Sequence, residues 1–135
     1  FVKQSMAYEI LYGRVGSDIC IRDRIIDSLT PDPGDMVVQK NRPSAFYSTQ
    51  LESVLAAMKL RSLEFCGVTT NMCVETTVRD ASQRDFRCFV VSDAVGEVDD
   101  DRAEVALITM GFFFGRVLTG DEVLESWKVE LSNVA

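Results

Sequence analysis

The sequence has 135 residues, a length that suits one domain with a single hydrophobic core. Hydrophobic residues make up 47%, charged residues 26%, and the formal net charge is -7. This acidic balance argues against binding to nucleic acid or to an anionic membrane, and no apolar run approaches the length of a membrane span.

The first 29 residues show no clear pattern, although Ile21, Ile25 and Leu29 could form one face of a short helix. A strong turn is expected at residues 31–35, where two prolines flank an aspartate and Gly34 follows. Residues 36–39 then read as a short buried strand, and residues 41–49 as a loop.

The next elements alternate between helix and strand. Apolar residues at i, i+3, i+4 and i+7 predict an amphipathic helix from position 51, with Thr49 as its N-cap. Residues 63–66 predict a strand that Gly67 closes. The same spacing predicts a second helix after Asn71, with Glu75 and Arg79 paired on its wet side. The two apolar stripes are Leu51, Val54, Leu55 and Met58, and Val74, Thr77, Val78 and Ala81.

The C-terminal part continues the alternation. The β-branched and aromatic run at residues 88–91 predicts a strand. Three aspartates at 99–101 suit a helix start, and residues 116–118 predict another short strand. Thr119 and Glu122 form a capping box for a last helix. The residues expected to pack these two helices are Ala103, Ala106, Leu107 and Met110, and Val123, Leu124 and Trp127.

This order predicts an α/β fold, a three-layer doubly wound parallel sheet with helices on both faces. The carboxyl ends of parallel strands meet at one edge, and ligands bind there. Lys40, residues 67–73 and Asp93 fall at that edge; for Asp93 we favour a turn or cap role over substrate binding.

The sequence contains four cysteines and no histidine. Two cysteines, Cys66 and Cys88, fall in predicted core strands, so we expect buried free thiols and a reduced, intracellular (cytoplasmic) protein. Without histidine, these residues cannot form a Cys-His dyad, a Ser-His-Asp triad or a histidine-ligated metal site.

Cys73 is the candidate nucleophile. It falls in the first turn of a predicted helix, where backbone N–H groups favour a thiolate and could stabilise an oxyanion. Lys40 follows a buried strand at the same edge, and its positive charge would further favour the thiolate. The alternatives are a cysteine that only packs and a lysine that is solvated at a strand end.

Several stretches together resemble the isochorismatase-like cysteine hydrolases, nearest to the ureidoacrylate and biuret amidohydrolases. They are Val-Val-Gln-Lys-Asn-Arg-Pro-Ser-Ala-Phe at 37–46, Thr-Gln-Leu at 49–51, Gly-Val-Thr-Thr-Asn-Met-Cys-Val-Glu-Thr at 67–76, and Arg-Asp-Ala at 79–81. The resemblance covers residues 33–127 approximately, and it implies an isochorismatase-like fold.

The resemblance also implies roles for individual residues. Cys73 would attack a carbonyl group and Lys40 would be the cation of a catalytic triad. A cis peptide bond between Val68 and Thr69 would turn the Thr69 N–H toward that of Cys73 to form the oxyanion hole. The pocket would be lined by Arg42, Phe46 and Asn71, and no metal or cofactor would be needed.

The sequence departs from the family at the catalytic base, an aspartate that follows the family's first strand. Asp18, Asp23 and Asp27 lie in the wrong context for that role. We therefore expect residues 1–135 to be the C-terminal part of a single hydrolase domain whose first strand and helix are absent.

The resemblance implies an amidohydrolase that cleaves a C–N bond of a small ureido, carbamoyl or amide compound through a thioester. A nicotinamidase-type hydrolase is an alternative, although no histidine precedes Lys40, and Cys73 argues against a true isochorismatase. A third possibility is a degenerate member that serves as a binding or assembly module. The family and the run at Phe112, Phe113 and Phe114 favour a dimer or tetramer, with this run in the core or at a subunit interface.

Overall fold

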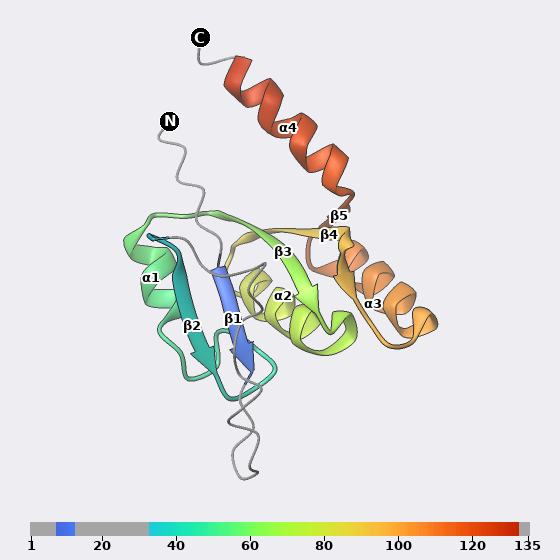
Figure 1. Ribbon diagram of the computed structural model, residues 1–135, viewed down its shortest axis with the longest axis horizontal. Coiled ribbons are helices and arrows are strands. Elements are labelled where there is room, and N and C mark those ends of the chain that lie inside the picture. The colour runs from blue at the N-terminus through green and yellow to red at the C-terminus, as the bar shows by residue number, and fades with distance from the viewer. Residues whose placement is uncertain (1–7, 13–32, 133–135) are drawn as a thin grey trace. The chain divides into compact units, whose positions relative to one another are not determined.

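The computed structural model describes residues 8–12 and 33–132, with side chains at 33–128. Its internal contacts divide the chain into two compact units, Phe1–Met58 and Lys59–Ala135, and each is described by itself. Figure 1 shows the elements of both units.

The first unit is built on two parallel strands. Strand β1 (Tyr8–Tyr12) pairs with β2 (Met36–Lys40), with Tyr8 opposite Met36 and Tyr12 opposite Lys40. Strand β2 is the predicted strand extended by one residue, so Lys40 is its last residue. Strand β1 falls in the segment that has no clear sequence pattern, and the short helix considered around Ile25 lies outside the described residues.

Helix α1 (Leu51–Ala57) follows the loop after β2, and Leu51 and Leu55 are its buried residues. The Thr49 hydroxyl accepts from the Leu51 N–H at 3.2 Å and donates to the Ala45 carbonyl at 2.5 Å. The N-cap predicted at Thr49 is therefore wrong by one residue, since Gln50 occupies that position, although the Thr49 hydroxyl still binds the first N–H of the helix.

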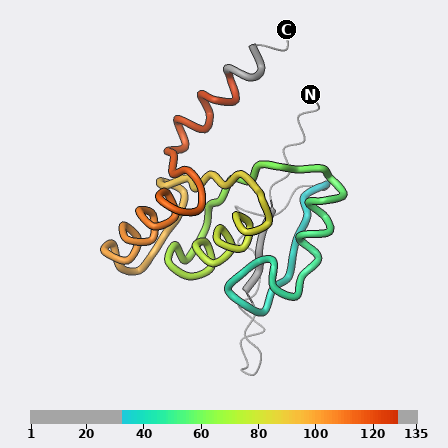
Figure 2. Tube along the Cα trace, turned by 180° about the vertical axis from the view of Figure 1, so that it is seen from behind, coloured from blue at the N-terminus to red at the C-terminus, as the bar shows by residue number. Residues whose placement is uncertain are grey.

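The second unit contains a parallel sheet in the order β3-β4-β5. The strands are β3 (Ser62–Val68), β4 (Arg87–Gly96) and β5 (Arg116–Leu118), so β4 is central. Figures 1 and 2 show helices α2 and α3 side by side on one face of this sheet and α4 running from the other. The predicted alternation of parallel strands and helices is confirmed.

The helices keep most of the predicted faces. A π-helical turn, η2 (Thr70–Val74), leads into α2 (Glu75–Ser82), and the stripe predicted for this helix is buried throughout. Helix α3 (Asp100–Phe113) is capped by the Asp99 side chain, which accepts from the Arg102 N–H at 3.0 Å. It buries Ala106 and Met110.

Helix α4 (Gly120–Ser132) begins at the predicted capping box. The Glu122 carboxylate accepts from the Thr119 N–H at 2.7 Å, and the Thr119 hydroxyl accepts from the Glu122 N–H at 3.3 Å. Within the described residues, no helix is both long and apolar enough to cross a membrane.

Two expectations about the core were wrong, and one of the two alternatives for the phenylalanine run at 112–114 is excluded. Cys66 is exposed rather than buried, because side chains alternate along β3 and the half-buried Leu63 and Phe65 occupy the inner face. Phe112 and Phe113 are 79% and 69% exposed, because α3 turns the side with Ala106 and Met110 inward. The core alternative for these rings is therefore wrong, and the interface alternative stays a prediction. Of the three residues expected to pack α4, only Val123 is buried; Leu124 and Trp127 are exposed.

Candidate active site

The loop between β3 and α2 begins at an irregularity in the sheet. The pairing of β3 with β4 shifts between Phe65 and Gly67, so that Gly67 lies opposite Val95 and Val68 opposite Gly96. Gly67 has a φ of +116, a conformation that residues with a side chain rarely adopt. The next peptide bond, between Val68 and Thr69, is cis, as the resemblance implied.

Cys73 lies in the π-helical turn that follows. The Thr69 carbonyl accepts from both the Met72 N–H at 3.3 Å and the Val74 N–H at 3.1 Å, which closes a wide turn around Cys73. Cys73 is half-buried, and its carbonyl accepts from the Thr77 hydroxyl at 2.6 Å. The cysteine is therefore at the start of a helical segment, where the sequence predicted it; its catalytic role stays a prediction.

A carboxylate that the sequence analysis missed contacts this turn. Glu97, which follows β4, accepts from the Asn71 N–H through Oε2 at 3.3 Å. Its other oxygen, Oε1, accepts from the Val98 N–H at 2.9 Å. Nothing in the local pattern around Glu97 indicates a partner 26 residues away.

A cavity of about 340 Å³ lies between this turn and α3. Asn71, one of the predicted pocket residues, lines it, whereas Cys73 does not. Glu75 also lines it and is held by Arg79 in an ion pair of 2.6 Å, which confirms the predicted i, i+4 pair. The other lining residues are Asp101, Arg102, Val105, Ala106 and Thr109.

Lys40 is in the first unit and is 3% exposed. Its Nζ donates to the Arg42 and Pro43 carbonyls, each at 3.0 Å. Such bonds are what a buried ammonium group requires. The alternative of a solvated lysine at a strand end is therefore wrong.

The two other predicted pocket residues of this unit differ in burial. Phe46 is buried at 5% exposure, while Arg42 is exposed and donates to the Asn41 carbonyl at 2.9 Å. The first unit thus holds Lys40, Arg42 and Phe46 on one loop. The second unit brings Val68, Thr69, Asn71 and Cys73 together on another.

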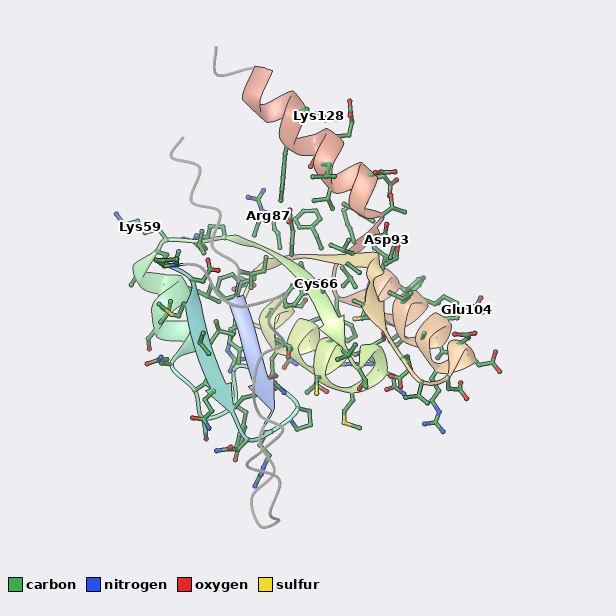
Figure 3. All side chains as sticks on the ribbon, in the orientation of Figure 1. Lys59, Cys66, Arg87, Asp93, Glu104 and Lys128 are labelled. Carbon is green, nitrogen blue, oxygen red and sulfur yellow. The ribbon has the colours of Figure 1, made fainter. Side chains whose placement is uncertain are left out.

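Three further polar or titratable side chains lie near the sheet of the second unit. Burial raises the pKa of the Cys88 thiol from 9.0 to about 11. The Asp93 side chain accepts from the Gly120 N–H at 2.8 Å at the start of α4 (Figure 3), which confirms the predicted cap role. The Thr70 hydroxyl is buried and has no hydrogen-bond partner among the described residues.

Metal-ligating side chains are not gathered in the part of the chain that the structure describes: no group of three or more Asp, Glu or Cys residues could hold an ion there. The second unit places the Cys73 thiol and the Glu97 carboxylate at the turn Thr70–Val74, while the Lys40 ammonium group belongs to the first unit.

The isochorismatase domain model matches residues 22–122. The chain belongs to the isochorismatase family. Solved structures of the family share its fold. An isochorismatase-like hydrolase from Alkaliphilus metalliredigens has a TM-score of 0.83 at 24% identity, covering 90% of this chain and 72% of that one. A cysteine hydrolase from Pseudomonas syringae pv. phaseolicola has a TM-score of 0.75 at 32% identity, covering 76% and 54%.

Curated relatives of this family member are named ureidoacrylate amidohydrolase RutB. The protein from Methylorubrum extorquens is 44% identical over 94 residues, which are 69% of this chain and 38% of that protein. The protein from Stutzerimonas stutzeri is 38% identical over 104 residues, which are 76% and 42% of the two. The chain thus spans about two-fifths of the length of these relatives.

Proposed function

We propose that this isochorismatase-family chain is the C-terminal part of a single hydrolase domain. We propose further that this domain is an amidohydrolase that uses Cys73 to cleave a C–N bond of a small ureido, carbamoyl or amide compound. The observation that carries the proposal is the placement of Cys73. It is half-buried in a wide helical turn that begins at Thr70, directly after the cis Val68–Thr69 peptide. The similarity to ureidoacrylate amidohydrolases supports a ureido substrate.

The proposed reaction has two halves. The Cys73 thiolate attacks the substrate carbonyl carbon, the C–N bond breaks, and the nitrogen leaves with a proton taken from solvent, which the second half returns. Water then attacks the thioester, which releases the acid and restores the thiolate. The oxyanion formed in each half accepts hydrogen bonds from the main-chain N–H groups of Thr69 and Cys73.

We assign to Lys40 the role of the cation that favours the thiolate and orients the substrate. Its burial and its two carbonyl acceptors hold the ammonium group in one place. The base is assigned by family resemblance to an aspartate after a strand, but β1 is followed by Gly13 and Arg14. Because a positioned base contributes about 10²–10⁴-fold, we expect slow turnover by these 135 residues.

The experiment is designed for slow turnover. The chain is mixed with ureidoacrylate, quenched in acid, and the intact mass and its peptides are measured for a covalent acyl group. We expect the group on Cys73, none in Cys73→Ala, and an undiminished amount in Cys66→Ala, the matched change at an exposed cysteine. Lys40→Met should lower the rate of labelling. Turnover that survives Cys73→Ala would contradict the proposal.

We also propose that the chain self-associates. The exposed rings of Phe112 and Phe113 give α3 an apolar surface that suits contact with a second copy. Light scattering after size-exclusion chromatography should give the mass of a dimer or tetramer, and Phe112→Ser should reduce it. A monomer at every concentration would contradict self-association and leave the catalytic proposal unaffected.

A further inference from the structure

The carboxylate of Glu97 connects two parts of the main chain that are far apart in sequence. Through Oε2 it accepts from the Asn71 N–H at 3.3 Å, and through Oε1 from the Val98 N–H at 2.9 Å. Asn71 is the second residue of the turn Thr70–Val74, which carries Cys73. One side chain thus ties the start of this turn to the segment that follows β4.

The residues just before Glu97 hold the other end of the same loop. Val95 pairs with Gly67, and Gly96 pairs with Val68, beyond the shift in the β3–β4 register. The approach at Gly96 is close, because a Cβ added there would lie 3.1 Å from Val68 Cγ1. The loop between β3 and the turn is therefore held at both ends by the segment 95–97: the strand pairing holds Gly67 and Val68, and the Glu97 carboxylate holds Asn71.

We propose that Glu97 is a positioning residue that fixes the turn around Cys73 by accepting from the Asn71 N–H. The inference rests on the proposed role of Cys73 as nucleophile. N–H groups at the start of a helical segment lack partners within it, and an ionised acceptor makes a stronger hydrogen bond than a neutral one. A displacement of about 1 Å in a reacting group can cost about 10²-fold in rate, so this fastening bears on catalysis.

Three variants of the 135-residue chain test the role. Glu97→Ala removes the acceptor. Glu97→Gln keeps an oxygen acceptor without the charge, and Glu97→Asp keeps the charge on a side chain one carbon shorter. Glu104→Ala is the matched control, since Glu104 is an exposed carboxylate on α3 that points away from the sheet (Figure 3).

The first measurement is amide hydrogen exchange at Asn71, Met72 and Cys73. We expect Glu97→Ala to speed exchange of the Asn71 N–H about fivefold to tenfold, the effect of losing one hydrogen bond. Glu97→Gln, which keeps a neutral acceptor, should recover part of the protection, Glu97→Asp should recover little, and Glu104→Ala should change nothing. Equal exchange in the wild type and Glu97→Ala, or full recovery by Glu97→Asp, would overturn the inference.

The second measurement separates positioning from folding. Cys88 is buried, so its labelling by a thiol reagent reports loss of the fold, and it should stay unlabelled in every variant. In turnover of ureidoacrylate, Glu97→Ala should lower kcat about tenfold or more, change KM less than about threefold, and be rescued by Glu97→Gln. If Glu97→Ala exposes Cys88, the comparison of Glu97→Gln with Glu97→Asp decides instead. If the wild type forms no acyl group on Cys73, the proposed function fails, and amide exchange still decides whether Glu97 holds the turn.

Discussion

Replacing Gly115 by alanine should destabilise the second unit, because the position has no room for a side chain. Gly115 connects α3 to β5 and lies against the main chain of β4. A Cβ added there would be 2.8 Å from Cys88 Cβ, 3.0 Å from the Cys88 carbonyl carbon and nearer still to its oxygen. Most of these atoms are main chain of the central strand, so they can give way only if the strand itself shifts.

The cost can be worked out from two opposing effects. Forcing an extra methyl group into a packed site costs about 1–3 kcal/mol. Replacing glycine also restricts the unfolded chain, which stabilises by about 0.4–1 kcal/mol. We therefore expect Gly115→Ala to lower the free energy of unfolding by about 1–2 kcal/mol.

Gly120→Ala is the matched control. Its added Cβ would lie 3.4 Å from Asp93 Oδ2, an ordinary contact, at the first residue of α4. This variant should be neutral or more stable by up to about 1 kcal/mol. The assay is urea unfolding followed by thiol labelling of Cys88, which is 3% exposed in the folded chain. Equal urea midpoints for the two variants would refute the steric argument.

Three other predictions follow from single contacts. Because burial raises the pKa of Cys88, the stability that its neutral thiol contributes is fully present below pH 9 and is lost as pH rises through about 11. Urea midpoints of the wild type should fall across that range, and those of Cys88→Ala should fall less. Thr70→Val should leave the free energy of unfolding unchanged or raise it, whereas Thr77→Val loses a hydrogen bond of 2.6 Å and should lower it by about 0.5–1.5 kcal/mol. A lower urea midpoint for Thr70→Val than for Thr77→Val would contradict this. A double-mutant cycle on Glu75 and Arg79 should give a coupling energy below about 1 kcal/mol, because solvent screens the exposed arginine side chain. A larger coupling energy would contradict this screening argument.

Patterns that repeat within a few residues predicted most of the second unit. The stripe from Val74 to Ala81, the capping box of Thr119 with Glu122, and the short strand before it all depend on neighbours in sequence. In this unit the local preferences favour the same helices and strands that the packing of the sheet stabilises. The predicted elements are therefore present, with strand ends that differ by a few residues.

Features that depend on distant partners were missed. Strand β1 exists by pairing with β2, which begins 24 residues after it ends, and its mixed sequence Tyr-Glu-Ile-Leu-Tyr has no alternation by which to detect it. Cys66 was misplaced because a free cysteine is apolar enough for either face of a strand. Phe112 and Phe113 are exposed because they lie away from the side of α3 that buries Ala106 and Met110, a side that the spacing of apolar residues predicts.

The two proposed catalytic side chains differ in the same way. Lys40 Nζ donates to the carbonyls of Arg42 and Pro43, two and three residues away, at the end of a strand that pairs with β1. The turn around Cys73 is bonded to Glu97, which lies 26 residues after Asn71, beyond α2 and β4 in the chain. The reactivity of Cys73 should therefore be lost as soon as urea separates β3 from β4. The two hydrogen bonds of Lys40 do not involve that sheet.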